Sequence, residues 1–192
     1  MDNPTATRWH RTPDQILGPY FPTGHVPAPQ VDLTSVKGVG GRAQGEIIEV
    51  TGRVLNLNGE PVRGIPITVW QANSFGRYAH DNDPNPAPLD SNFGGCVGIR
   101  SDDDGGYRIK TVKPGAYPAG PDWIRPPHIH FEVHGRFERL ITQMYFPDEP
   151  LNASDRALNA ALRPDLLIAK PVPSKDGSRY RVLNFDIILT RG

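Results

Sequence analysis

The sequence predicts an all-β fold: an antiparallel β-sandwich with long ordered loops, an irregular N-terminal arm and at most one or two short helices. Glycine and proline supply 20 and 21 of the 192 residues without a collagen repeat, a composition typical of many turns. Short stretches of alternating apolar and polar residues recur along the chain, and turn formers separate them. Many short strands at regular spacing indicate a sandwich.

The length predicts one domain over residues 1–192, of which 1–45 form the irregular arm. A segment rich in Asn, Asp, Pro and Gly, 71–97, is expected to be a long ordered loop, which in a compact domain is usually functional. A short helix is predicted over 157–163. The predicted strands run, in chain order, over 46–55, 65–70, 97–100, 107–110, 128–133, 139–146 and 182–189.

The charge balance excludes some kinds of partner. Lys plus Arg and Asp plus Glu each number 21, so the formal net charge is zero, which argues against nucleic acid or an anionic membrane. The single cysteine, Cys96, cannot form an intrachain disulfide, the first eight residues do not resemble a signal peptide, and no apolar run has transmembrane length. We therefore expect a cytoplasmic protein, and a neutral surface is compatible with a homo-oligomer.

The most informative feature is a pair of histidines, His128 and His130, in a predicted strand. Residues i and i+2 of a strand point to the same face, so the two imidazoles can bind one ion. Upstream, Tyr78 and Tyr117 lie in predicted turns rich in glycine and proline. Imidazole accepts iron, copper or zinc, and two phenolate oxygens would complete a set of donors that favours ferric iron.

Each part of this pattern has an ordinary explanation when it is taken alone. A His-x-His pair also occurs by chance on polar strand faces, and single tyrosines more often belong to a core or a turn. The remaining histidines lack partners at metal-binding spacing and are expected to have no role in a metal site; they are His10, His25, His80 and His134.

Five motifs taken together weigh against these ordinary explanations. They are VWQANSFGRY at 69–78, LDSNF at 89–93, KPGAYP at 113–118, RPPHIHF at 125–131 and QMYF at 143–146. In this order they resemble the motifs of the intradiol ring-cleavage dioxygenases, and within that family the chain looks most like the protocatechuate 3,4-dioxygenase branch. The resemblance is good over about residues 46–150 and looser at the ends.

The resemblance implies a ferric, non-haem iron site with O2 as co-substrate. Matched motif by motif, the four iron ligands fall on Tyr78, Tyr117, His128 and His130. Tyr117 would also act in catalysis, together with Arg125 and Gln143. The implied reaction is intradiol cleavage of a small aromatic diol in aromatic catabolism, with protocatechuate the expected substrate and a carboxymuconate the product; another catechol, hydroxyquinol or a substituted catechol is the alternative.

The resemblance also implies an active site to which two neighbouring chains contribute. In two-subunit relatives, a Gly-Pro-Tyr turn and an arginine reach the iron from a neighbouring chain. Gly18, Pro19 and Tyr20 match the turn, and Arg136 matches the arginine that meets the substrate carboxylate. We therefore expect a homo-oligomer with active sites near subunit interfaces. Ala119 stands where the family often has tryptophan, so the shape of the pocket departs from the family pattern.

Two rival hypotheses remain from the sequence. One is a zinc or Fe(II) enzyme that uses His128 and His130 with a carboxylate such as Glu132 or Asp122. The other is a non-catalytic β-sandwich binding module that needs no metal.

Overall fold

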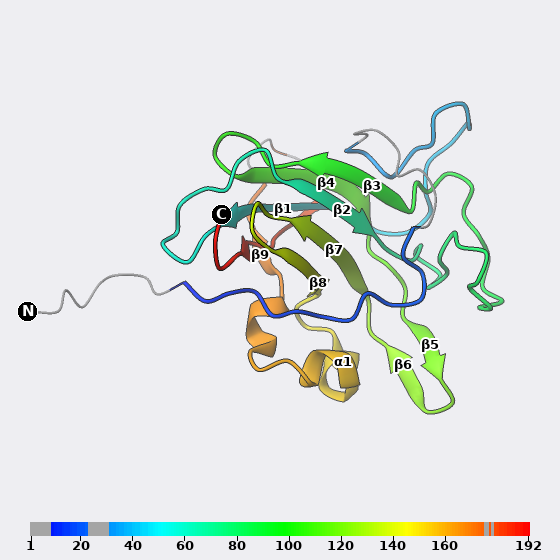
Figure 1. Ribbon diagram of the computed structural model, residues 1–192. Coiled ribbons are helices and arrows are strands. Elements are labelled where there is room, and N and C mark those ends of the chain that lie inside the picture. The colour runs from blue at the N-terminus through cyan, green and yellow to red at the C-terminus, as the bar shows by residue number, and fades with distance from the viewer. Residues whose placement is uncertain (1–8, 23–30, 175–176, 178) are drawn as a thin grey trace, which may run out of the picture.

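The computed structural model describes residues 9–22, 31–174, 177 and 179–192 (Figure 1). His25 and parts of the predicted arm, 1–8 and 23–30, lie outside the described residues. Two β-sheets share one continuous apolar core, which confirms the predicted β-sandwich.

The first sheet has five strands built around its longest member, β1 (Ile47–Leu55). On one side β1 pairs with β4 in antiparallel register, and on the other side it pairs with β10 and β11 in parallel. The parallel pairs depart from the purely antiparallel sandwich expected from the sequence. The remaining bounds in this sheet are β4 (Gly106–Val112), β9 (Lys170–Val172), β10 (Arg181–Asn184) and β11 (Ile187–Ile188).

The strand predicted over 182–189 is interrupted between β10 and β11, although both parts keep the same offset against β1. At the break, the side chain of Asp186 accepts a hydrogen bond from the backbone N–H of Arg53 at 2.9 Å. Gly52 makes this close approach possible, because a Cβ atom there would lie 2.0 Å from the carbonyl oxygen of Phe185. A local side chain thus replaces one backbone bond of the ladder.

The second sheet is antiparallel and has the order β3-β2-β7-β8. In β7, the alternate residues Ile129, Phe131 and Val133 face the core between the sheets. The intervening residues, His128 and His130 among them, therefore face away from that core. The bounds are β2 (Pro66–Trp70), β3 (Cys96–Arg100), β7 (His128–His134) and β8 (Arg139–Tyr145).

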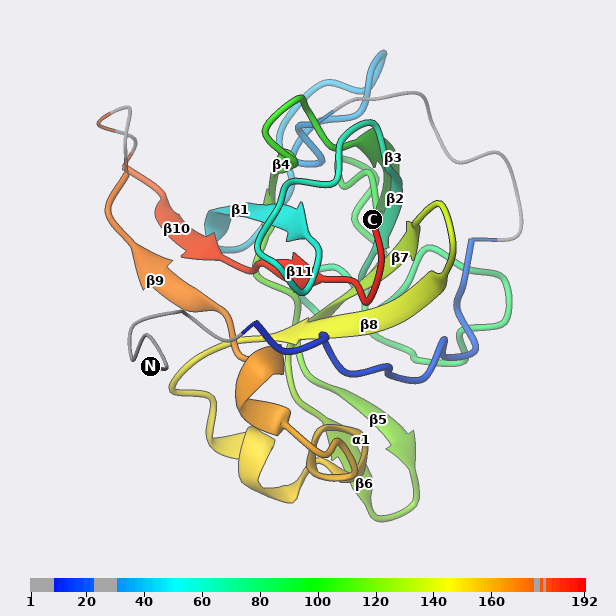
Figure 2. The same cartoon turned by 60° about the vertical axis from the view of Figure 1, so that its left-hand side comes forward.

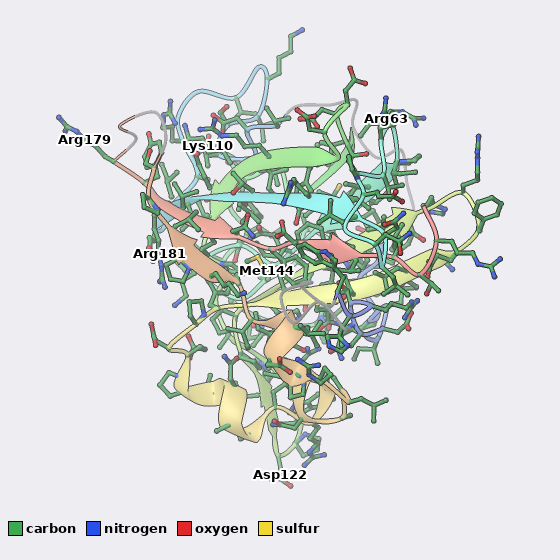
Figure 3. The ribbon with its side chains drawn as sticks, turned by 90° about the vertical axis from the view of Figure 1, so that its left-hand side faces the viewer. Arg63, Lys110, Asp122, Met144, Arg179 and Arg181 are labelled. Carbon is green, nitrogen blue, oxygen red and sulfur yellow. The ribbon has the colours of Figure 1, made fainter. Side chains whose placement is uncertain are left out.

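Aromatic and aliphatic side chains from both sheets fill the core. Phe131 of the second sheet lies 5.4 Å from Phe185 and 5.8 Å from Tyr107, measured between ring centroids. Met144 is fully buried and lies in the middle of the molecule in Figure 3. The face of the second sheet that carries the histidines needs a separate cover, which loops and the arm supply.

A two-stranded hairpin, β5 (Tyr117–Gly120) with β6 (Trp123–Arg125), projects from the body beside α1 (Figure 1). The sequence did not predict this hairpin, because its strands are very short. The helix predicted over 157–163 is shorter than expected: α1 (Arg156–Asn159) ends where the amide of Asn159 bonds back to the carbonyl of Asp155. Two 3₁₀ turns flank it, η1 (Pro150–Ser154) and η2 (Pro164–Leu167).

The first described segment of the N-terminal arm, 9–22, follows the free edge of β8 (Figures 1 and 2). The N–H of Gln15 donates to the carbonyl of Ile141 at 2.8 Å, and the hydroxyl of Thr142 donates to the carbonyl of Pro13 at 2.9 Å. The arm thus covers an edge that would otherwise be exposed. No helix in the described part of the chain is long and apolar enough to cross a membrane.

Candidate metal centre

The histidine pair lies on the covered outer face of the second sheet. His128 and His130 are only 1% and 2% exposed. Their Nε2 atoms lie 3.1 Å apart, so both ring nitrogens face the same point. The strand geometry that predicted a shared face is confirmed.

The two tyrosines approach this pair from separate segments. The phenol oxygen of Tyr78, in the loop after β2, lies 3.1 Å from Nε2 of His130. The phenol oxygen of Tyr117, the first residue of β5, lies 3.4 Å from Nε2 of His128. Four potential ligand atoms therefore meet in one buried cluster. Tyr117 begins a strand, although the sequence had indicated a turn.

A close backbone contact brings the two tyrosine segments together. Gly76 has a φ of +80°, and a Cβ atom there would lie 2.2 Å from the carbonyl oxygen of Ala116. Only glycine fits both this conformation and this contact. The glycine-rich character of both motifs thus has a structural cause.

Two buried polar side chains hold the loop that carries Tyr78. The carboxylate of Asp83 accepts a hydrogen bond from the backbone N–H of Tyr78 at 2.7 Å. The amide oxygen of Asn73 accepts bonds from the N–H groups of Phe75 and Arg77 at 2.9 and 3.0 Å. The predicted long loop is therefore ordered by its own Asn and Asp side chains.

The tautomer of His128 follows from its second ring nitrogen. Nδ1 lies 2.7 Å from the carbonyl oxygen of Pro126, which can only accept a hydrogen bond. Nδ1 therefore carries the proton, and Nε2 presents its lone pair to the cluster. A backbone carbonyl that fixes the tautomer in this way is typical of metal-binding histidines.

Burial sets the protonation of the cluster. Burial, with the nearby Arg125 cation, lowers the pKa of His128 to about 3, and burial with His128 and Arg125 lowers the pKa of His130 well below its ordinary value. Burial also raises the pKa of Tyr78 and of Tyr117. Both imidazoles are therefore neutral, whereas the phenols need a nearby positive charge to ionise.

A row of polar residues stands directly behind the cluster. Arg125 is the cross-strand partner of Tyr117, Gln143 of His130, and Tyr145 of His128. Nη2 of Arg125 donates to the amide oxygen of Gln143 at 2.6 Å and to the phenol oxygen of Tyr145 at 2.8 Å. The predicted residues Arg125 and Gln143 thus contact each other and adjoin the cluster.

The Gly-Pro-Tyr turn of the arm lies against the cluster of its own chain. The ring of Tyr20 lies 4.7 Å from that of Tyr78, and a Cβ atom on Gly18 would lie 3.3 Å from Cε1 of His130. The prediction that this turn reaches the site from a neighbouring chain is therefore wrong for Gly18 and Tyr20. The arm runs along β8 of its own chain, so this turn reaches the cluster without a second subunit.

Arg136 lies elsewhere. It is exposed in the turn between β7 and β8, at the opposite end of β7 from His128. Within one chain the structure does not bring it to the cluster. Its contact with a substrate in a neighbouring chain stays a prediction.

The carboxylates of the rival metal site lie outside the cluster. Glu132 pairs with His134 at 3.2 Å and also with Arg139. Asp122 lies at the tip of the β5–β6 hairpin and points away from the body (Figure 3). Among the described residues, no group of three His, Cys, Asp or Glu side chains could hold a metal ion. The His-carboxylate alternative therefore lacks its third ligand there.

Sequence reasoning missed several residues around the cluster. Trp70 stacks on His130 with ring centroids 4.7 Å apart, and the loop carboxylate Asp83 fixes the backbone of Tyr78. Tyr145 lies inside a quoted motif but was assigned no role. Asp155 had only the signal of an Asp before a short helical segment, which predicts an N-cap and nothing more.

Fold and site define a class of protein: a β-sandwich in which two phenols and two imidazoles meet in a buried cluster beside an arginine. A family model described as "Dioxygenase" matches residues 16–191. The protocatechuate 3,4-dioxygenase beta chain of Burkholderia cepacia is 44% identical over 165 residues, which cover 82% of this chain and 70% of that one. The chain belongs to the intradiol ring-cleavage dioxygenase family.

Two further relatives extend the comparison. The hydroxyquinol 1,2-dioxygenase of Rhizobium sp. (strain MTP-10005) is 31% identical; the match covers 92% of this chain and 62% of that enzyme's length. The dioxygenase domain of a carbohydrate-binding fusion protein from Streptomyces sp. SirexAA-E has a TM-score of 0.72 at 27% identity, covering 95% of this chain and 100% of that one. The predicted family, enzyme class and fold are confirmed.

Proposed function

We propose that this chain is a non-haem, Fe(III)-dependent dioxygenase that uses O2 to cleave a catechol between its two hydroxylated carbons. The observation that carries the proposal is the sequence of contacts from Tyr78 to His130, His128 and Tyr117, with donor atoms 3.1, 3.1 and 3.4 Å apart. Neighbouring ligands bound at about 2 Å to one metal ion lie roughly 3 Å from each other.

The chemistry of the donors supports ferric iron. Two ring nitrogens that face each other at 3.1 Å need a shared proton or a cation between them, and the Nδ1 proton of His128 leaves its Nε2 as an acceptor. Two phenolates would cancel two of the three charges of a ferric ion, which makes its burial less costly. Bound ferric iron would supply the redox chemistry that couples a catechol to O2.

The chain's own residues would have three tasks. As a phenolate, Tyr117 would be a base whose oxygen can accept a hydroxyl proton of the catechol, while Tyr78 would remain a ligand. The buried guanidinium of Arg125, held by Gln143, would stabilise negative charge that develops on the substrate ring. The aromatic cover over the cluster would exclude water from it.

Within this class, protocatechuate is the substrate that we propose, giving a carboxymuconate. The name of the 44% identical relative supports this choice. Protocatechuate carries a ring carboxylate, and a guanidinium can pair with it bidentately. Gly18, Pro19 and Tyr20 would form a wall of the pocket, and Arg136 of a neighbouring copy would bind the carboxylate. Catechol, hydroxyquinol or a substituted catechol is the alternative.

We also propose a homo-oligomer in the cytoplasm, with residues 1–192 forming one domain. If Arg136 binds the substrate carboxylate, the oligomer follows, because this exposed arginine lies away from the cluster of its own chain. The zero formal charge is compatible with an oligomer, and the single cysteine is compatible with the cytoplasm.

Three measurements on the purified protein test the proposed function. We expect one iron per chain, a visible phenolate-to-iron absorption band that changes when catechol is added, and a muconate-type diacid as product. A colourless zinc protein, or a yellow semialdehyde from cleavage beside the diol, would contradict the proposal.

A further inference from the structure

Asp155 is a buried carboxylate that bonds to Arg125, the arginine beside the cluster. It lies between η1 and α1 and is 0% exposed. One of its oxygens accepts hydrogen bonds from Nε1 of Trp123 at 2.9 Å and from Nε of Arg125 at 3.0 Å. The other accepts from the backbone N–H of Leu158 at 3.0 Å, which makes Asp155 the N-cap of α1. A single carboxylate therefore joins a helix to the buried arginine.

The bonds of Arg125 leave one nitrogen unused. Nε binds Asp155, and Nη2 binds Gln143 and Tyr145, with a long contact of 3.5 Å to Asp155. No acceptor in the described part of the chain bonds to Nη1. Because the guanidinium is planar and rigid, fixing two of its nitrogens fixes the third. The protein therefore presents Nη1 in one defined position.

Charge makes Asp155 special among these partners. Gln143 and Tyr145 are neutral, so Asp155 is the only carboxylate bonded to Arg125 in the described residues. Arg125 is itself only 2% exposed. A buried cation that loses its bonded counterion tends to move toward water or another anion.

We propose that Asp155 is a positioning residue of the ring-cleavage reaction: it holds Arg125 so that Nη1 remains available to the substrate, and it couples this geometry to α1. This inference rests on the proposed function and deepens it. Trp123 belongs to the same unit, because its indole N–H binds the carboxylate oxygen that holds Nε of Arg125.

The test is Asp155→Asn in the iron-loaded, full-length enzyme. Asparagine is also a good N-cap, so the helix keeps its capping group while the charge is lost. We expect kcat per bound iron to fall by about 10- to 100-fold, because small displacements of a reacting group have effects of this size. KM should change much less, and the absorption band of the substrate-free enzyme should be unchanged.

Asn159→Ala is the matched control. The side chain of Asn159 binds the carbonyls of Asn152, Ala153 and Asp155, so its removal loosens the same helix without touching Arg125. We expect a lower Tm with normal kcat per bound iron. If both variants lost kcat in proportion to their loss of Tm, Asp155 would be only a helix cap and the proposal would be overturned.

Asp155→Glu keeps the test decisive if the asparagine variant does not bind iron. It retains the charge but moves the carboxylate, so we expect iron binding with an intermediate fall in kcat per iron. Wild-type kcat per iron in the glutamate variant would overturn the inference. Absence of iron and turnover in the wild-type protein would instead overturn the proposed function.

Discussion

At the scale of single residues, Tyr78 illustrates how burial and the proposed ferric ion would have opposite effects on the pKa of a phenol. Burial, with the nearby Tyr117, raises its pKa well above the ordinary value, so the isolated phenol stays neutral. A trivalent cation beside its oxygen reverses this preference, because the charged form then gains a buried partner. In the proposed site, ion binding and proton release from Tyr78 would therefore be coupled.

We predict that Tyr78→Phe removes or strongly alters the visible absorption band and lowers the iron content. The change deletes one phenolate oxygen while the aromatic ring and its packing remain. Absorption spectroscopy and metal analysis measure the result. An unchanged spectrum together with full iron content would show that Tyr78 is not a ligand.

Tyr107→Phe is the matched control for this variant. Tyr107 is another buried tyrosine, and its hydroxyl donates to the carbonyl oxygen of Phe185 in the core between the sheets, not in the cluster of Tyr78 and Tyr117. Its removal should lower the free energy of unfolding by about 1–2 kcal/mol and leave the band intact.

The residues found from sequence and those missed differ in one physical respect. Local motifs identify all four residues of the cluster: His128, His130, Tyr78 and Tyr117. The two-residue period of a strand also places the two histidines on one face. Asp155 acts through contacts with Arg125 and Trp123, which lie 30 and 32 positions away in sequence. Local patterns contain no information about such contacts, so only the tertiary structure reveals them.

At the scale of elements, the segments that carry Tyr78 and Tyr117 lie about 40 positions apart in sequence and must meet for the cluster to form. Gly76 and Gly115 provide the contact: a Cβ atom on Gly115 would lie 2.5 Å from the backbone nitrogen of Gly76. The approach of the backbones determines how far apart Tyr78 and Tyr117 lie, with ring centroids at 5.4 Å.

We predict that Gly76→Ala destabilises the fold and reduces iron binding. The positive φ of +80° alone costs about 1 kcal/mol with alanine, and the clash with Ala116 adds to it. Gly64→Ala is the control, because Gly64 has a φ of +69° and nothing within 4 Å of the added Cβ. Thermal unfolding and metal analysis of both variants separate backbone strain from the contact. Equal effects of the two changes on iron content would contradict the prediction.

The strands were predictable where a strand alternates in hydrophobicity over several residues, as in β1, β7 and β8. The final strand was predicted in the right place, with Leu183, Phe185, Ile187 and Leu189 all in the core. Its parallel pairing with β1 was missed, because alternation specifies which face is buried but not which neighbour the strand selects. The β5–β6 hairpin was missed because strands of four and three residues show no period.

At the scale of the whole molecule, Glu138 joins three distant segments. It accepts hydrogen bonds from Nε of Arg11 at 3.0 Å and from the backbone N–H of Arg191 at 2.9 Å. Burial alone would raise its pKa, but the bonds from Arg191, Arg11 and Thr190 together lower it. The carboxylate therefore holds the N-terminal arm and the C-terminal segment against the β7–β8 turn.

We predict that Glu138→Gln lowers the free energy of unfolding at pH 7 by about 0.5–1 kcal/mol. The folded pKa is depressed, so this contribution is complete above the unfolded pKa of about 4.3 and is lost as the pH falls through the folded value. Urea unfolding of both proteins at several pH values measures it. The difference between them should shrink below about pH 4; a difference that does not change with pH would show that charge is not its cause.

The proposed sharing of the site between chains depends on Arg136, and the position of this residue leads to a specific prediction. The residue is exposed at the end of β7 remote from His128, whereas Gly18 and Tyr20 already line the cluster within one chain. If Arg136 binds the substrate carboxylate, it must do so in a neighbouring copy. We expect Arg136→Ala to raise KM for protocatechuate by about 10-fold or more, since a lost bidentate pair leaves a carboxylate unpaired. Turnover of catechol, which has no carboxylate, should be nearly unchanged.

Mixing experiments decide whether the site is shared. A mixture of Arg136→Ala with the iron-ligand variant His130→Ala should regain protocatechuate turnover after subunit exchange, because some sites then combine an intact cluster with an intact arginine. Arg100→Ala is the control, since Arg100 is an exposed arginine on β3 that donates to the carbonyl of Gly64 and should leave both substrates unaffected. Equal losses on protocatechuate and catechol would exclude carboxylate binding by Arg136. A monomer in analytical ultracentrifugation with full protocatechuate activity would exclude a shared site, because the geometry of one chain keeps Arg136 away from the cluster.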